Sequence, residues 1–209
     1  MDKTIVSYDK TARDFAKNVA GLVPMSELEK FIDNLSSNTD NLSSKFVLDV
    51  GCGSGVASAA LNERGCIVTG IDLSKELLKI ATKTSPHSTF YEMDARELKF
   101  PEETFNGVWH CGTLLHLPSD EAYGALEETY RVLDKNGILY LSVKEGQGEG
   151  FENDKRYGGV EKWWTYFKEE DINHMLDKIG FEVLESYVVG YDDKYRNAHP
   201  WMNFFSRKN

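Results

Sequence analysis

A glycine-rich turn that directly follows an unbroken apolar run constrains the fold of this chain more than any other feature of its sequence. The run covers residues 46–50, the turn reads GCGSG at 51–55, and a helical pattern of small residues follows at 56–64. Glycine is needed where the backbone turns sharply and where a ligand approaches without interference from a Cβ atom. The helix that follows presents unpaired N–H groups at its start. The segment therefore predicts a buried strand, a ligand-binding loop and a helix, in that order.

The alternation of apolar runs and amphipathic helical patterns continues along the chain. Further strands are expected at 66–71, 89–93, 105–110 and 138–143, and the helices between them begin after Ser74 and Ser119. We expect the second of these helices to continue to Leu133 and to stop at Asn136-Gly137. Unbroken apolar strands separated by amphipathic helices are typical of a parallel sheet that is covered on both faces.

The two ends of the chain differ from this alternation. Residues 8–35 predict two short helices, and the Ser- and Asn-rich stretch 36–45 predicts a surface connection. Near the C-terminus, strands are expected at 181–189 and 201–205. No helical pattern joins these last two strands, so we expect them to be antiparallel to each other.

Three aspartates stand at the ends of predicted strands and indicate what the glycine loop binds. Asp72 ends the second run, where a carboxylate accepts two ribose hydroxyls in dinucleotide folds. The dinucleotide fingerprint GxGxxG also requires a glycine at position 56, but this chain has Val56. Asp49, just before the loop, would repel a pyrophosphate and attract an ammonium or sulfonium group. Asp94, after the third run, can accept a hydrogen bond from an adenine amino group.

Five segments together carry a resemblance to a known family: VLDVGCGSG (47–55), VTGIDLS (68–74), MDAREL (93–98), FNGVWHCGTLLHLP (105–118) and RVLDKNGILYLSV (131–143). They resemble the class I S-adenosylmethionine-dependent methyltransferases. The resemblance implies an α/β fold, a Rossmann-like doubly wound seven-stranded sheet that is mostly parallel, with the last strand antiparallel beside the fifth and with helices on both faces. It also implies S-adenosylmethionine as the cofactor and S-adenosylhomocysteine as its product.

The resemblance assigns cofactor roles to individual positions. Asp49, Gly51, Gly53 and Cys111 would lie near the methionine part, with Gly112 beside Cys111. Asp72 would hold the ribose, and Leu73, Asp94 and Ala95 would contact the adenine. Tyr8 resembles the aromatic residue that closes over the cofactor from the N-terminal helix in many members of the family.

The residues that handle the methyl acceptor have no fixed motif in this family. His116 follows the fourth strand and is either a catalytic base or a loop histidine packed against a lid. His110, inside an apolar strand, is expected to be a hydrogen-bonded structural histidine. The segment 145–167, rich in glycine and aromatic residues, is expected to cover the substrate. With the preceding Lys144, it supplies candidate acceptor ligands in Arg156, Tyr157 and Trp163.

Composition limits the partners and the setting. A length of 209 residues fits one domain, which we assign to 1–209 with a helical lid over 1–40 and an insertion at 145–167. The net charge of −10 argues against nucleic-acid binding driven by phosphate contacts. Three cysteines without a CxxC pair argue against a disulfide framework and a metal site. The charged N-terminus and the lack of a long apolar run indicate a cytoplasmic protein that does not enter a membrane.

The most consistent hypothesis is an S-adenosylmethionine-dependent methyltransferase that transfers a methyl group to a small-molecule acceptor by in-line displacement. The chain lacks an NPPY-like sequence after the fourth strand, which argues against base amino groups of nucleic acids as acceptors. Two alternatives stay open: a nicotinamide-dependent oxidoreductase that uses the same sheet edge, and a non-catalytic S-adenosylmethionine-binding module. The identity of the acceptor, the acceptor atom and the oligomeric state are left open by the sequence.

Overall fold

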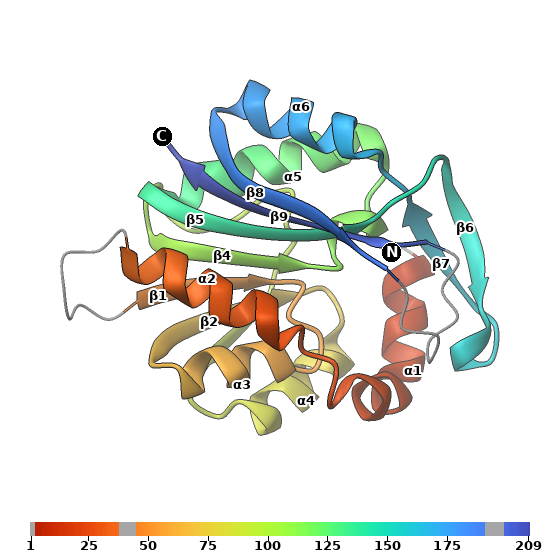
Figure 1. Cartoon of the computed structure of the whole chain (residues 1–209). Coiled ribbons are helices and arrows are strands. Elements are labelled where there is room, and N and C mark those ends of the chain that lie inside the picture. Colours follow the sequence, from red (N-terminus) through yellow and green to blue (C-terminus); the bar gives the residue numbers. More distant parts are fainter. Residues whose placement is uncertain (1–2, 38–44, 191–198) are drawn as a thin grey trace.

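A seven-stranded sheet forms the centre of the molecule in the computed structural model, which describes residues 3–37, 45–190 and 199–209 (Figure 1). Its strand order is β3-β2-β1-β4-β5-β9-β8. The strands are β1 (Lys45–Val50), β2 (Cys66–Asp72), β3 (Thr89–Glu92), β4 (Phe105–Cys111), β5 (Leu133–Lys144), β8 (Phe181–Val189) and β9 (Trp201–Lys208). Strands β1 to β5 are parallel, and β9 lies antiparallel between β5 and β8. The predicted mostly parallel sheet with its inserted last strand is confirmed.

Helices cover both faces of the sheet. They are α1 (Lys3–Val19), α2 (Met25–Ser37), α3 (Val56–Glu63), α4 (Lys75–Thr84), α5 (Ser119–Val132) and α6 (Glu169–Ile179), with short 3-10 turns η1 (Leu114–His116) and η2 (Lys155–Tyr157). Helices α5 and α6 lie on one face, whereas α2, α3 and α4 lie on the other (Figure 1). Helix α1 stands at the end of the sheet, next to β7 (Figure 1).

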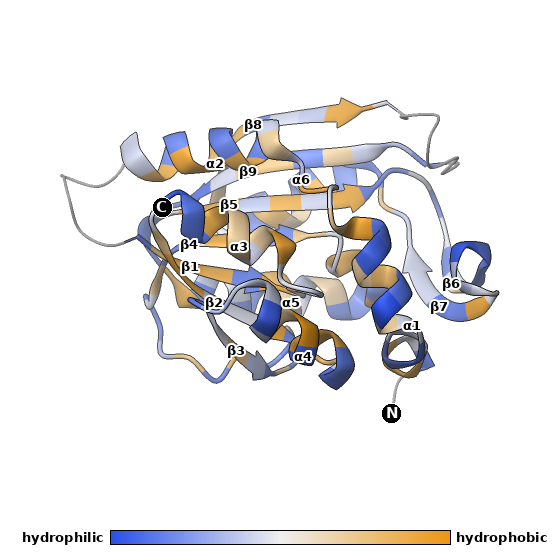
Figure 2. Cartoon of the chain, turned by 90° about the horizontal axis from the view of Figure 1, so that it is seen from below, coloured by the Kyte–Doolittle hydropathy of each residue, from blue (hydrophilic) through white to orange (hydrophobic). Residues whose placement is uncertain are grey.

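Two hydrophobic cores follow from this layering. One joins the sheet to α5 and α6, and the other joins it to α2 and α3, where Phe31 packs edge-on against Trp109 with ring centroids 5.5 Å apart. Figure 2 shows hydrophobic residues gathered on the central strands, with hydrophilic residues on the outer turns of the helices. None of the helices in the described residues is both long enough and apolar enough to cross a membrane.

Two local expectations are wrong. Helix α5 ends at Val132, and Leu133 already pairs with Phe105 as the first residue of β5. Asn136, with φ of 61°, therefore lies at an irregularity inside the strand instead of ending the helix. His110 is fully buried as expected, but neither of its ring nitrogens has a hydrogen-bond partner in the part of the chain that the structure describes. Burial lowers the pKa of His110 to about 4, so the ring is neutral.

The segment after β5 forms a second, two-stranded sheet. Strands β6 (Glu149–Asp154) and β7 (Val160–Thr165) are antiparallel and are joined by η2. The sequence analysis assigned no strand here, because the glycines at 146, 148 and 150 interrupt any alternating pattern. This hairpin stands beyond the carboxyl ends of the parallel strands and contacts α1 (Figure 1).

Candidate active site

The glycine loop between β1 and α3 has a backbone that other residues adopt only with strain. Gly51, Gly53 and Gly55 all have positive φ, at 68°, 54° and 79°. A Cβ atom on Gly51 would lie only 2.0 Å from the Thr113 hydroxyl oxygen, and one on Gly55 would lie 2.9 Å from the backbone of Ala81. The loop is therefore packed from two sides, by the residue after β4 and by α4, and only glycine fits.

A cavity of about 160 Å³ opens in front of this loop, at the carboxyl ends of β1, β2, β3 and β4. Its lining includes the candidate base His116 and most of the cofactor candidates: Tyr8, Gly51, Gly53, Asp72, Leu73, Asp94, Ala95 and Cys111. The structure thus brings together residues from α1, from four strand ends and from η1. The volume is below the usual range for ligand pockets.

Asp72 faces this cavity and also holds the glycine loop. Its Oδ2 accepts a hydrogen bond from the backbone N–H of Gly53 at 2.9 Å, and its Oδ1 accepts one from that of Ser74 at 2.8 Å. Burial raises the pKa of Asp72, while these backbone donors oppose the shift. A carboxylate oxygen can accept more than one hydrogen bond, so Asp72 keeps acceptor capacity for ligand hydroxyls.

Asp49 is the cofactor candidate that does not line the cavity. Its side chain is buried behind the loop, and the Ser58 hydroxyl donates a hydrogen bond to Oδ2 at 2.6 Å. Burial raises the pKa of Asp49 to about 7, although the bond from Ser58 lowers it. We expected Asp49 near the ligand's amino group, directly or through water; the structure places it behind the loop, outside the cavity lining.

Asp94 lines the cavity but is already paired. Arg96 donates from its backbone N–H and from Nε to Oδ1 of Asp94, each at 2.9 Å. Burial tends to raise the pKa of Asp94, but the hydrogen bonds and the charge of Arg96 outweigh it and hold that pKa below its ordinary value. Arg96 also pairs with Glu121 of α5. Asp94, the candidate acceptor for the adenine amino group, is thus a carboxylate whose position is fixed by Arg96, and Arg96 lines the same cavity.

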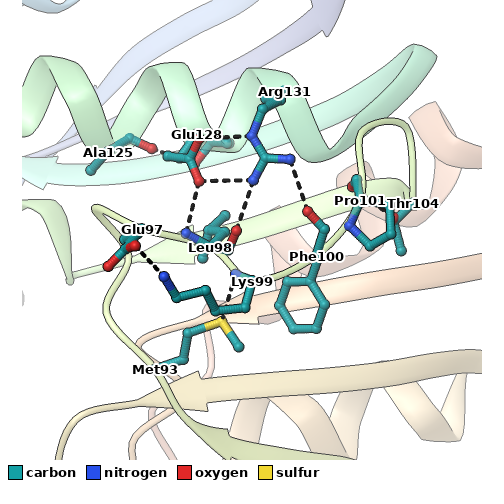
Figure 3. A network of polar contacts seen from close by, with 11 residues as sticks. Met93, Glu97, Leu98, Lys99, Phe100, Pro101, Thr104, Ala125, Glu128 and Arg131 are labelled. Atoms are coloured by element: carbon teal, nitrogen blue, oxygen red, sulfur yellow. Dashed lines mark hydrogen bonds and ion pairs between the residues drawn. The ribbon is translucent and has the colours of Figure 1, made fainter.

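A polar network fixes the segment that carries Asp94 (Figure 3). The Arg131 guanidinium on α5 donates to the carbonyl oxygens of Leu98 and Phe100, both at 2.8 Å. Glu128, which pairs with Arg131, accepts a hydrogen bond from the backbone N–H of Leu98 at 2.8 Å. Residues 93–100 have no regular secondary structure, so α5 supplies the partners for their backbone.

Helix α1 closes the cavity from outside. Tyr8 and Phe15 lie one above the other on the helix face toward the cavity, with ring centroids 5.2 Å apart. Asp9 accepts hydrogen bonds from the Ser74 hydroxyl at 2.6 Å and from the backbone N–H of Glu76 at 3.2 Å, at the start of α4. On the opposite side, the Ser7 hydroxyl donates to the carbonyl of Glu161 in β7 at 2.6 Å. Helix α1 is therefore attached to α4 and to the hairpin.

Within the described part of the expected lid over 1–40, only α1 lines the cavity. Helix α2 packs its apolar face against the sheet, where Leu28, Phe31 and Leu35 are fully buried, and it contributes nothing to the cavity lining. The 145–167 segment does not line the cavity either. Instead it contacts α1, where the Ser7 hydroxyl donates a hydrogen bond to the carbonyl of Glu161.

His116 is held between α1 and the hairpin in a defined tautomer. Its Nδ1 lies 2.7 Å from the carbonyl oxygen of Trp163, which can only accept, so Nδ1 carries the proton. Nε2 is then an acceptor and lies 2.8 Å from the Tyr8 hydroxyl, which donates to it. Burial raises the pKa of Tyr8, so this hydroxyl stays protonated. His116 therefore presents a basic nitrogen at the wall of the cavity.

The four acceptor candidates lie on the hairpin side of the molecule and not at the cavity wall. Arg156 forms an ion pair with Asp154 and lies 5.5 Å from the centre of the Tyr157 ring, which packs beside Phe15 of α1. The ring of Trp163 packs edge-on against Phe151 within the hairpin. Lys144, at the end of β5, places its ammonium 4.0 Å from the centre of the Trp164 ring. None of the four lines the cavity described above.

The cavity lining also contains residues that were not candidates from the sequence, among them Phe15, Arg96 and Thr113. Phe15 follows Tyr8 by seven residues, so two turns of helix place both on one face, and this spacing was a usable signal. Arg96 and Thr113 follow cofactor candidates by one or two positions in loops, where no periodicity exists to show which way a side chain points.

The described residues contain no group of three or more His, Cys, Asp or Glu side chains that could hold a metal ion. Burial raises the pKa of the Cys111 thiol, so it is neutral where it lines the cavity. The site therefore offers a polar centre at Asp72, an apolar side at Leu73 and Ala95, and an imidazole at His116.

Comparisons with known proteins identify this kind of site. Residues 48–141 match the family model described as a methyltransferase domain. The ubiquinone biosynthesis O-methyltransferase of Pasteurella multocida is 26% identical over 94% of this chain and 89% of that protein. Two other relatives match over only 40% and 46% of their own lengths.

Solved structures share the whole architecture. A S-adenosylmethionine-dependent methyltransferase of Methanosarcina mazei has a TM-score of 0.74 at 23% identity, covering 90% of this chain and 98% of that one. The Burkholderia thailandensis 1,6-didemethyltoxoflavin-N1-methyltransferase, solved with its substrate and S-adenosylhomocysteine, also has a TM-score of 0.74, at 20% identity, and covers 98% of this chain and 88% of that one.

Neither the oxidoreductase nor the non-catalytic alternative finds support in these matches. The strand order with its reversed β9, the glycine loop and the matched relatives agree with each other. The chain therefore carries a methyltransferase domain at residues 48–141 and has the fold of S-adenosylmethionine-dependent methyltransferases.

Proposed function

We propose that this enzyme transfers the methyl group of S-adenosylmethionine to a hydroxyl oxygen of a small molecule, with His116 as the base. Bound S-adenosylmethionine supplies an activated methyl group on a sulfonium. The observation that carries the proposal is the tautomer of His116: the Trp163 carbonyl fixes the proton on Nδ1 and leaves Nε2 basic, beside the same cavity as the glycine loop. The name of the Pasteurella multocida relative, an O-methyltransferase, also favours oxygen as the acceptor atom.

The cofactor roles follow from the chemistry of the lining. Asp72 has the acceptor capacity to hold two ribose hydroxyls, while Leu73 and Ala95 offer apolar contacts for an adenine ring. Asp94 would accept the adenine amino group with its orientation fixed by Arg96. The residues Gly51, Gly53 and Cys111 would lie along the methionine part, with Tyr8 above it and Asp49 attracting its ammonium from behind the loop.

The catalytic contribution of the protein is alignment and removal of one proton. In-line displacement requires the acceptor oxygen, the methyl carbon and the sulfur to lie on one line, and a closed α1 would restrict the acceptor to that approach. His116 Nε2 would take the hydroxyl proton once the acceptor replaces the Tyr8 hydroxyl as its partner. Closure by α1 would also exclude water from the transfer.

The first test is a screen of catechols, phenols and hydroxy acids for release of S-adenosylhomocysteine, followed by kinetics of His116→Asn. Asparagine keeps a donor toward the Trp163 carbonyl but cannot take a proton. We expect kcat to fall by roughly 10²- to 10⁴-fold, the usual contribution of general base catalysis. Affinity for S-adenosylhomocysteine should change little.

Tyr8→Phe is the matched control, because it removes the hydroxyl that contacts His116 but keeps the ring over the cavity. It should retain most of the activity, since the hydroxyl is a partner of the resting state only. A His116→Asn enzyme with the wild-type kcat and pH profile would show that the histidine is structural.

The net charge of the chain bears on the kind of acceptor. A small acceptor, not a nucleic acid, is consistent with the net charge of −10. We also propose a cytoplasmic location, which the three free cysteines favour and which fractionation of cells that express the tagged chain tests.

A further inference from the structure

Lys144 is a buried lysine between two tryptophan rings. It is the last residue of β5 and is only 5% exposed. Its ammonium nitrogen lies 4.0 Å from the centre of the Trp164 ring and 5.7 Å from that of Trp201, which pairs with Lys144 across β5 and β9. Contacts with aromatic faces stabilise a cation only in part, because they do not replace the hydrogen bonds of water.

No described carboxylate serves as the partner of this ammonium. Asp154, which contributes to its electrostatic environment, already pairs with Arg156 at 2.9 Å and with Lys162 at 3.2 Å. Glu152 accepts a hydrogen bond from the Tyr166 hydroxyl at 2.9 Å. Among the residues that the structure describes, no oxygen accepts a hydrogen bond from Lys144 Nζ. The other lysine buried in this region, Lys162, has a carboxylate partner, so Lys144 differs from it.

Lys144 also lies close to the catalytic end of the cavity. The ring of Trp164 contacts both Lys144 and His116: its centre lies 4.0 Å from Lys144 Nζ and 4.8 Å from the centre of the histidine ring. Trp201 in turn faces Gly112, where an added Cβ atom would lie 3.5 Å from the indole ring. Gly112 and His116 both line the cavity. The candidate base and the Lys144 ammonium therefore contact the same indole ring, and the ammonium has no hydrogen-bond or ion-pair partner among the described residues.

We propose that Lys144 binds an anionic oxygen of the methyl acceptor, so that the acceptor is a small hydroxylated acid whose reacting hydroxyl meets His116 and whose charged group lies about one aromatic ring away. This inference rests on the proposed function. An anion at this place would supply the charge-assisted hydrogen bond that the buried ammonium lacks among the described residues. A neutral analogue of the same shape would leave the charge unpaired, which is the basis for selectivity.

The surroundings of Lys144 give this recognition a pH dependence. Burial, together with the charges of Arg156 and Lys162, lowers the pKa of Lys144 to about 8, although Asp154 and Glu152 oppose the shift. The ammonium form, which binds the anion, is therefore present below about pH 8 and is lost above it. Binding of an acid should weaken as the pH rises through this value.

The experiment is a calorimetric titration of the full chain, saturated with S-adenosylhomocysteine, with pairs of acids and their uncharged amides. Suitable pairs are 4-hydroxybenzoate with 4-hydroxybenzamide, 3,4-dihydroxybenzoate with its amide, and 4-hydroxyphenylacetate with its amide. We expect at least one acid to bind about 10- to 100-fold more tightly than its amide, the range of a charge-assisted hydrogen bond. Lys144→Met should reduce this preference to near unity while the affinity for S-adenosylhomocysteine stays unchanged.

Lys30→Met is the matched control. It removes the same charge from another lysine that contacts aromatic rings, with Nζ 4.4 Å from the centre of the Tyr187 ring, on the outer side of the sheet. It should keep the wild-type preference for acids. If Lys144→Met does not fold, the pH titration of the wild-type chain decides instead: the ratio of acid affinity to amide affinity, measured at each pH, should fall as the pH rises through about 8.

Three results would overturn the inference: equal affinity of the wild-type chain for acids and amides, binding of no acid in the panel, or an unchanged preference in Lys144→Met. Failure of the wild-type chain to bind S-adenosylhomocysteine would overturn the proposed function itself, and this inference with it. The saturation step, performed first, therefore separates the two failures.

Discussion

At the scale of single residues, Asp49 and Asp72 show how two carboxylates at neighbouring strand ends take different tasks. Both belong to the glycine-loop region, and burial raises the pKa of each. Asp72 faces the cavity, whereas Asp49 is enclosed behind the loop with Ser58. The sequence could place both at the carboxyl edge of the sheet. It could not show which one reaches the ligand, because this depends on the path of the loop in three dimensions.

The raised pKa of Asp49 predicts a pH dependence of cofactor binding. With a pKa of about 7, Asp49 is neutral below that pH and charged above it. A ligand ammonium favours the charged form, so affinity for S-adenosylmethionine should rise with pH between about 6 and 8 and level off above, with a limiting slope of about tenfold per pH unit below pH 7. Calorimetric titrations at several pH values measure this directly.

Asp49→Asn should bind more weakly at pH 8 and should lose the dependence between pH 6 and 8, since asparagine keeps an acceptor for Ser58 but does not titrate. The same slope in Asp49→Asn and in the wild-type chain would mean that another group is responsible, and the assignment of Asp49 to the ligand ammonium would then be wrong.

At the scale of elements, the segment 93–100 depends on α5 for its conformation. Arg131 and Glu128 supply the hydrogen bonds of its backbone groups, as Figure 3 shows. The sequence indicated the strand before this segment and the cofactor candidates Asp94 and Ala95 within it. It gave no indication of Arg131, because an arginine in the last turn of an amphipathic helix is usually a surface residue.

Arg131→Met should therefore affect both stability and cofactor binding. The carbonyl groups of Leu98 and Phe100 would lose their donors, at a cost of about 1–3 kcal/mol in the free energy of unfolding. Adenosine affinity should fall by several-fold as the adenine side of the cavity loosens. Urea unfolding and calorimetric titration with adenosine measure the two effects.

Arg64→Met is the control for Arg131→Met, because Arg64 forms a surface ion pair with Glu29 far from the cavity lining. It should change the free energy of unfolding by less than about 1 kcal/mol, as for other surface pairs, and leave adenosine affinity unchanged. Equal adenosine affinity in Arg131→Met and the wild-type chain would show that the network supports the fold alone.

Contacts between elements that are far apart in the sequence account for most of the features that the sequence could not predict. The apolar face of α2 predicts burial, but not that its partner is the sheet instead of the cavity. Closure by α1 depends on Tyr8 contacting His116, 108 residues away, and on Ser7 contacting Glu161, 154 residues away. Local patterns carry no information on such pairs.

At the scale of the whole molecule, most of the fold could be predicted because local sequence patterns determine its strands and helices. Each strand and helix of the central sheet has its own apolar pattern, and parallel strands joined by helices allow few arrangements. The reversed β9 was also predictable, from the missing helical pattern before it together with the family resemblance. The sequence pointed to Lys144 as a candidate acceptor ligand, but not to its contacts with Trp164 and Trp201, since the three residues come from separate segments.

The central claim is that the cavity in front of the glycine loop holds S-adenosylmethionine through Asp72. The most direct test is calorimetric titration of the wild-type chain and of Asp72→Ala with S-adenosylmethionine, S-adenosylhomocysteine and NADH. We expect the wild-type chain to bind both adenosyl compounds and not NADH, and Asp72→Ala to lose about 1–3 kcal/mol of binding free energy. Binding of NADH in place of the adenosyl compounds, or an unchanged affinity of Asp72→Ala, would contradict the account.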